Sequence, residues 1–209
     1  MTDHPMDTKS AGRPVLILAS ASPRRRELLS AMGCEFVVDA ADIDETRRQQ
    51  ESPEKYVQRL AREKAAAVAA RLHSASPPNT AAPVVLAADT IVAQGQNIFG
   101  KPSDREHAYA MWQSLSDTQH TVMTAVCLHY DGEVDLELVQ SQVQFCAIGE
   151  QQMARYWESG EPADKAGAYA IQGLASAWVQ LVHGSYSNVV GLPLHETNRL
   201  LKSVGHNWL

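Results

Sequence analysis

The residues with the clearest chemical potential are 20–26, Ser-Ala-Ser-Pro-Arg-Arg-Arg, which contain three consecutive arginines. An apolar run at 15–19 precedes them and predicts a buried strand, and the serine–proline pair is typical of a helix N-terminus. That end of a helix favours anions, so three cations there are unfavourable unless a negatively charged ligand neutralises them. Backbone N–H groups and guanidinium groups at one point would suit a phosphate-bearing ligand. The alternative is a solvated basic patch.

Two further residues are unusual for their positions. Asp89 follows the apolar run 84–88, so we expect it at the C-terminal end of a strand, where a carboxylate can bind a divalent metal or accept a proton from water. An aspartate that starts a turn is the alternative. Lys64 lies four residues after Leu60 and four before Val68, on the inward face of a predicted helix. It either extends to the helix edge or meets buried negative charge.

A loop with three carboxylates follows the second predicted strand. Glu45, Asp42 and Asp44 could hold a magnesium ion through oxygen ligands together with Asp89, although an ordinary acidic loop would have the same composition. Lys101 is followed by proline, which restricts its backbone to an extended conformation and gives its side chain a defined direction. A surface lysine is the alternative for that position.

Residues 159–173 form a polar loop with an unusual combination of side chains. Three glycines would let the backbone approach a ligand closely, and turn formation would explain them equally well. Turn formation does not explain why Asp164, Lys165, Tyr169 and Gln172 lie beside them. The Gln172 amide both donates and accepts hydrogen bonds, which suits the edge of a nucleobase.

The overall composition narrows the class of protein. The chain has 209 residues, 44% of them hydrophobic, and a formal net charge of −6, which argues against nucleic-acid binding through a basic face. No apolar run approaches the roughly 18 residues of a membrane span, and residues 1–13 are polar and predict a disordered tail. Cys34, Cys127 and Cys146 lack metal-site spacing and predict reduced thiols in the cytoplasm.

The order of elements predicts an α/β fold with a mixed, twisted sheet flanked by helices. Residues 73–83 predict a flexible connection, 184–191 a loop, and 131–132 (Asp-Gly) the turn of a long hairpin. After the tail we expect a single domain, 14–209. Strands are predicted at 15–19, 35–40, 84–88, 121–130, 134–146 and 177–182, and helices at 23–32, 52–72, 103–115, 150–157 and 194–204.

Several of these segments together resemble the Maf family of nucleoside triphosphate pyrophosphatases. They occur in the order typical of the family and extend over nearly all of the chain from residue 15. The tripeptide 171–173, Ile-Gln-Gly, and the threonine after Asp89 resemble the branch that prefers dTTP and UTP. The matching segments are Leu-Ala-Ser-Ala-Ser-Pro-Arg-Arg (18–25), Arg-Glu-Lys-Ala (62–65), Ala-Asp-Thr (88–90), Gly-Lys-Pro (100–102), Asp-Lys-Ala-Gly-Ala-Tyr (164–169) and Gly-Leu-Pro-Leu (191–194).

The resemblance implies a fold, a reaction and a set of roles. The fold is two lobes around a deep cleft, as in Maf and ITPase proteins. The reaction is attack of water on the α-phosphorus of a nucleoside triphosphate, which yields a nucleoside monophosphate and pyrophosphate with a divalent cation, Mg²⁺ or Mn²⁺, as cofactor. Asp89 would be the general base and a metal ligand with Glu45; Arg25, Lys64, Lys101 and Ser20 would hold the triphosphate; Lys165 would close over the phosphates; and Arg24, Thr90 and Gln172 would set base preference.

The resemblance also bears on partners and on alternatives. Proteins of this family often form dimers, so a homodimer is one expected state, while no nucleic-acid or membrane partner is expected. Two other functions compete with a dTTP and UTP pyrophosphatase: a nucleotide-sensing regulator of cell division, and the same hydrolysis of a purine triphosphate.

Overall fold

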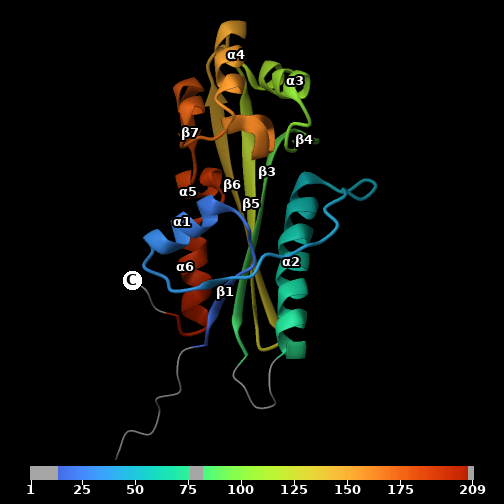
Figure 1. The fold of residues 1–209 in the computed structure, drawn as a ribbon, viewed down its shortest axis with the longest axis vertical. Coiled ribbons are helices and arrows are strands. Elements are labelled where there is room, and N and C mark those ends of the chain that lie inside the picture. Colours follow the sequence, from blue (N-terminus) through green and yellow to red (C-terminus); the bar gives the residue numbers. More distant parts are fainter. Residues whose placement is uncertain (1–13, 76–81, 207–209) are drawn as a thin grey trace, which may run out of the picture.

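The computed structural model describes residues 14–75 and 82–206, which fold around one mixed sheet (Figure 1). The strands run in the order β2-β1-β3-β5-β6-β7, with β4 paired to β3. The pairings of β1 with β2 and β3 are parallel, and the others are antiparallel. The strands are β1 (Leu16–Leu18), β2 (Val37–Val38), β3 (Val84–Gln94), β4 (Asn97–Phe99), β5 (Gln119–Tyr130), β6 (Glu133–Phe145) and β7 (Val179–His183).

The long strands β3, β5 and β6 run along the length of the molecule (Figure 1). The predicted hairpin is confirmed, because Tyr130 pairs with Glu133 across a turn in which Asp131 and Gly132 both have positive φ. Such a two-residue turn matches the right-handed twist of the strands that it joins.

One edge of β3 has a gap between its partners. Strand β1 pairs with residues 84–86 of β3, from Leu16↔Val84 to Leu18↔Leu86, and β4 pairs only with residues 92–94 of β3. Residues 87–91 of β3 therefore have no strand beside them on that edge. The other edge of β3 pairs with β5 from Val85 to Ala93 without interruption. Backbone carbonyls that face the gap therefore need partners from outside the sheet.

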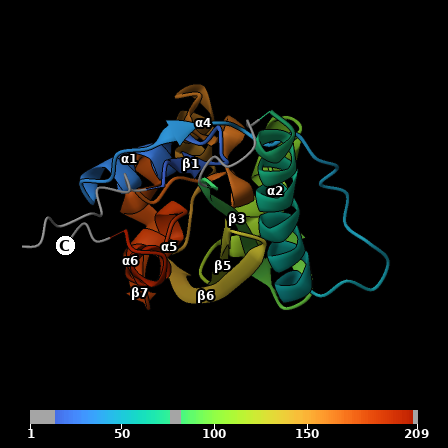
Figure 2. The same cartoon turned by 90° about the horizontal axis from the view of Figure 1, so that it is seen from below.

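Helices cover both faces of the sheet. Helix α2 lies along one face, and α1, α5 and α6 lie on the other (Figures 1 and 2). Helix α2 buries its Val57–Ala61–Ala65–Val68 stripe against the sheet, as its periodicity predicts. The helices are α1 (Pro23–Ala31), α2 (Pro53–Ala75), α3 (Arg105–Leu115), α4 (Glu150–Glu158), α5 (Tyr186–Val190) and α6 (Leu194–Ser203).

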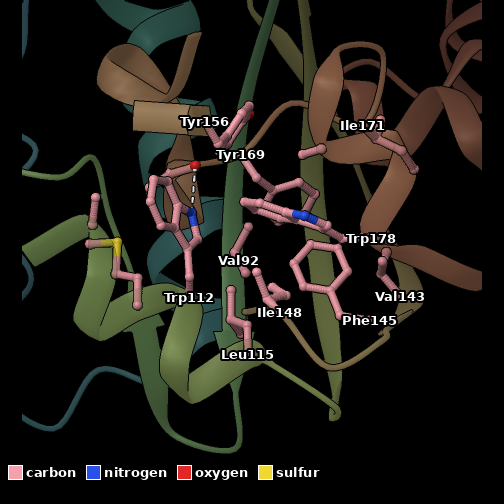
Figure 3. Packing of buried hydrophobic residues seen from close by; sticks show 14 of the residues in the cluster. Val92, Trp112, Leu115, Val143, Phe145, Ile148, Tyr156, Tyr169, Ile171 and Trp178 are labelled. Carbon is pink, nitrogen blue, oxygen red and sulfur yellow. Dashed lines mark hydrogen bonds between the residues drawn. The ribbon is translucent and has the colours of Figure 1, made fainter. Parts of the chain in front are cut away.

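One core lies between α2 and the sheet, and a second lies between the sheet and helices α1 and α6. A third core, rich in aromatic rings, fills the end of the molecule that carries α3 and α4 (Figures 1 and 3). Trp112 lies 5.3 Å from Tyr156 and 5.6 Å from Trp178 between ring centroids, and all three are buried. The Trp112 indole Nε1 donates to the carbonyl oxygen of Ala168 at 2.9 Å. This core therefore anchors the polar loop 159–173 and forms one lobe. The other lobe consists of α2 on one face of the sheet and α1, α5 and α6 on the other face.

The structure corrects several predicted boundaries. Strand β3 continues to Gln94, so Asp89 lies in the middle of a strand and not at its end. Helix α2 continues to Ala75, and the predicted loop 184–191 contains α5. The predicted tail 1–13 and residues 76–81 of the predicted connection lie outside the described residues. No helix in the described part of the chain is both long and apolar enough to traverse a bilayer.

Candidate functional site

A pocket of about 550 Å³ opens beside the unpaired edge of β3, in the gap between β1 and β4. Five cationic side chains and three carboxylates line it, so it concentrates positive charge in a chain whose net charge is −6. The lobes on either side both contribute to its walls. Apart from Asp42 and Asp44, the site residues expected from the sequence lie on these walls: Ser20, Arg24, Arg25, Glu45, Lys64, Asp89, Thr90, Lys101, Lys165 and Gln172.

Lys64 joins two carboxylates from different segments. Its ammonium nitrogen lies 2.7 Å from Asp89 Oδ1 and 2.7 Å from Glu45 Oε1. Asp89 is buried on β3, whereas the Glu45 side chain is 54% exposed on the loop before α2. Of the two alternatives for an inward-facing lysine, contact with buried negative charge is therefore the correct one.

Burial raises the pKa of Asp89 above its ordinary value, while the positive charges of Lys64 and Arg25 oppose that shift. A carboxylate in this state holds a proton more readily than a solvated aspartate. It therefore suits a group that takes a proton from water near neutral pH.

Arg25 is directed into the protein, although it is the third residue of α1. Its guanidinium donates four hydrogen bonds: Nε to Gly191 O at 2.9 Å, Nη1 to Ala88 O at 2.7 Å and to Ser20 Oγ at 3.1 Å, and Nη2 to Thr90 Oγ1 at 3.0 Å. The bond to Ala88 satisfies a carbonyl that faces the gap in β3. Burial lowers the pKa of Arg25, and four of its five donors are occupied.

The three arginines that were predicted to converge on one anion thus differ in environment. Arg25 is buried and braces the wall of the pocket, Arg24 lines the pocket, and Arg26 is exposed. Ser22 occupies the N-cap position of α1, but its side chain makes no capping hydrogen bond. The free cationic surface of this wall is therefore that of Arg24.

Lys101 and Lys165 face the pocket from the aromatic lobe. Lys101 is exposed and has no ion-pair partner among residues 14–75 and 82–206. Lys165 pairs with the carboxylate of Asp164, and its ammonium also donates to Glu161 O at 3.2 Å. Gln172 is exposed on a turn of the same loop.

The Thr90 hydroxyl belongs to a buried hydrogen-bond chain. Besides accepting from Arg25, it lies 3.0 Å from Thr124 Oγ1, which donates to the carbonyl of Asn188 at 3.0 Å. Asn188 in turn donates to Ser141 Oγ at 2.9 Å. The chain crosses β3, β5 and β6 and fixes the orientation of Thr90 at the pocket wall.

The carboxylate oxygens near Lys64 are of the type that a hard divalent cation binds. Mg²⁺ is commonly bound by one or two carboxylates together with substrate phosphates and water. Asp89 and Glu45 meet at one lysine and supply such carboxylates. No cluster of three or more His, Cys, Asp or Glu side chains suited to a metal occurs in the described ranges, so the remaining ligands would have to come from the substrate and solvent. Asp42 and Asp44 do not line the pocket.

Tyr56 is a pocket residue that the sequence analysis missed. Its hydroxyl donates to Glu45 O at 2.9 Å and so fixes the loop that carries Glu45. Tyr56, Leu60 and Lys64 are four residues apart, which places them on one face of α2. That spacing would have identified the tyrosine from the sequence.

Comparison with known proteins identifies the family of this chain. Residues 15–204 match the family model described as Maf-like protein. A Myxococcus xanthus protein named dTTP/UTP pyrophosphatase is 52% identical over 94% of this chain and 95% of its own length. Proteins with the same name from Hahella chejuensis (50% identical, 93% and 94% covered) and Vibrio cholerae (47% identical, 89% and 96% covered) are also similar. The chain belongs to the Maf family.

Proposed function

We propose that this protein hydrolyses dTTP and UTP to the nucleoside monophosphate and pyrophosphate. The observation that carries the proposal is the meeting of Asp89, Lys64 and Glu45 in a cation-lined pocket of about 550 Å³. Relatives that are named for this activity match almost the entire chain, which supports the choice of substrate.

Asp89 is the general base in this proposal. Its carboxylate takes a proton from water, the water oxygen forms a bond to the α-phosphorus, and the bond from that phosphorus to the bridging oxygen of pyrophosphate breaks. Lys64 holds Asp89 in place through their 2.7 Å contact. Such reactions are catalysed mainly by positioning and by neutralising charge on the phosphate oxygens.

The lysines of the aromatic lobe neutralise the leaving group. Lys101 and Lys165 line the pocket and bind the phosphates, while Arg25 keeps the other wall in shape. Ser20 Oγ accepts from Arg25, and its own hydroxyl proton can be donated to a phosphate oxygen. Mg²⁺ or Mn²⁺ held by Asp89 and Glu45 would supply further neutralisation of the phosphate oxygens.

Base preference comes from Gln172, Thr90 and Arg24. The Gln172 amide can hydrogen-bond the edge of a pyrimidine. A single methyl group such as that of thymine contributes only ~1–3 kcal/mol to discrimination, so the kcat/KM values for dTTP and UTP should differ by no more than about two orders of magnitude.

The test is pyrophosphate release by the purified protein with Mg²⁺ or Mn²⁺ and a panel of dTTP, UTP, CTP, ATP and GTP, compared by kcat/KM. The highest values are expected for dTTP and UTP. Faster turnover of ATP or GTP would point to a purine substrate, and nucleotide binding without turnover would favour a sensing role.

Two further expectations belong to the same proposal. The three cysteines are unpaired, with Cys34 and Cys127 buried, which supports a reducing, cytoplasmic location. We also expect a homodimer, and the mass measured by light scattering would test that state.

A further inference from the structure

The turn that carries Gln172 is held at both ends by two side chains from the preceding segment. The Tyr156 hydroxyl accepts from Ala170 N at 3.0 Å and donates to Glu161 Oε1 at 2.7 Å. The second carboxylate oxygen, Oε2, accepts from Leu174 N at 3.1 Å. We call Tyr156 and Glu161 the clasp, because they join the backbone before Gln172 to the backbone after it.

The clasp lies directly against the turn at Gly173. A Cβ atom at this position would lie 2.2 Å from both carboxylate oxygens of Glu161, so only glycine fits beside the carboxylate. The φ of Gly173 is −107°, which other residues can adopt, so a side chain here would be opposed only by the Glu161 carboxylate and would have to displace it. Gly173 N also donates to Ala170 O at 3.0 Å, which closes the turn from within.

The clasp is itself fixed to the aromatic core. Tyr156 is buried, and its ring centroid lies 4.7 Å from that of Trp178 and 5.3 Å from that of Trp112 (Figure 3). Gln172, in contrast, is exposed at the pocket. The position of its amide in the pocket therefore depends on the backbone of the turn, and the backbone depends on the clasp.

We propose that Glu161 and Tyr156 are positioning residues for recognition of the nucleobase, acting through the turn 170–174 and Gln172. This inference rests on the proposed function, in which Gln172 reads the base. The clasp does not touch the substrate. It sets the orientation of an amide that must meet donors and acceptors at fixed places on a pyrimidine ring, and a small displacement is costly for such contacts.

The experiment compares Glu161→Gln and Tyr156→Phe with the wild-type protein. The glutamine variant keeps the size of the side chain but replaces one carboxylate oxygen with an NH₂ group. That group cannot accept a hydrogen bond, so the bond from the Tyr156 hydroxyl or the bond from Leu174 N is lost. The phenylalanine variant removes only the hydroxyl. For each, kcat/KM is measured with dTTP, UTP and CTP, since thymine and uracil share one hydrogen-bonding edge that cytosine lacks.

The dTTP-to-CTP ratio of kcat/KM is expected to fall about tenfold in each clasp variant, equivalent to ~1.4 kcal/mol. The change should appear in KM for dTTP, with kcat nearly constant. Tripolyphosphate carries no base, so its inhibition constant against dTTP hydrolysis should stay at the wild-type value. A general loss of structure would weaken the inhibitor and the substrate together.

Two matched variants serve as controls. Glu158→Gln changes an exposed carboxylate at the end of α4, and Tyr109→Phe removes a hydroxyl whose contact is Arg105 Nη2 at 3.1 Å. Both should keep the wild-type ratio. In a Gln172→Ala background, Glu161→Gln should change the ratio no further, because the clasp acts through that glutamine.

The outcomes separate the inference from the function on which it rests. Wild-type hydrolysis with an unchanged dTTP-to-CTP ratio in folded Glu161→Gln and Tyr156→Phe would refute the inference alone. Equal weakening of tripolyphosphate and dTTP would also refute it, in favour of a purely structural role. A wild-type protein that releases no pyrophosphate from any triphosphate would refute the proposed function and the inference with it.

Discussion

Replacement of Arg25 by lysine tests whether this side chain braces the pocket wall. The variant keeps the positive charge but removes the fork that reaches four acceptors on three segments, the carbonyls of Gly191 and Ala88 and the hydroxyls of Ser20 and Thr90. One ammonium cannot reach this set of acceptors. At least two of the hydrogen bonds should be lost, and buried acceptors would remain without donors.

The expected loss of stability follows from those contacts. A hydrogen bond to a charged group contributes ~1.5–3 kcal/mol, and buried acceptors without partners add to the cost. Since neighbouring bonds are not additive, we expect the free energy of unfolding to fall by about 3–5 kcal/mol. That is a large part of the ~5–15 kcal/mol of a typical domain.

Urea denaturation followed by tryptophan fluorescence measures this change, because Trp112 and Trp178 are buried. Arg26→Lys is the matched control: it is the next residue of α1, carries the same charge and is exposed. The control should lie within about 0.5 kcal/mol of the wild type. If Arg25→Lys also lies within about 1 kcal/mol of the wild type at an unchanged m-value, the bracing role is refuted.

Three other predictions concern separate features. Asp89→Asn should abolish pyrophosphate release while nucleotide binding, measured by calorimetry, persists; turnover near the wild-type rate would exclude Asp89 as the base. Hydrogen bonds from Arg59 lower the pKa of Glu51 from 4.5 to about 2. This contribution to stability is complete above pH ~4.5 and is lost as the pH falls toward about 2, because the unfolded chain binds the proton first. Arg59→Lys should therefore reduce the difference in urea stability between pH 7 and pH 3. Arg48 forms an exposed ion pair with Glu63, so Arg48→Lys should leave that difference unchanged. An unchanged difference in the Arg59 variant would refute this assignment. Gly184→Ala places a Cβ 2.8 Å from Ser141 Oγ at a φ of +121° and should cost about 1–3 kcal/mol of stability. Gly205→Ala, at a φ of +81° but with no atom within 4 Å, should cost less, and equal losses would show that crowding at Ser141 is unimportant.

The elements and the members of the site were largely predictable from the sequence. Apolar periodicity identified α2 and placed Lys64 on its buried face, because burial and helical period are linked directly. The hairpin followed from Asp131 and Gly132. Motif order identified the family and with it the residues that line the pocket.

The sequence did not predict the contacts between residues that are far apart in the chain. The end of the apolar run 84–88 predicts a strand end at Asp89, although tertiary pairing with β5 continues the strand through it. The direction of Arg25 depends on acceptors as remote as Gly191, which no local pattern contains. The role of Glu161 becomes visible only when the turn beyond Gly173 folds back against it.

The two short strands that flank the gap in β3 come from segments about eighty residues apart, Leu16–Leu18 and Asn97–Phe99. A single longer strand along that edge would satisfy every backbone group and would also fill the pocket. The chain instead leaves the sheet incomplete and supplies a guanidinium in place of the missing strand at Ala88. For protein design, it follows that an opening for a ligand can be made inside one continuous sheet by interrupting a neighbouring strand, without adding a second domain.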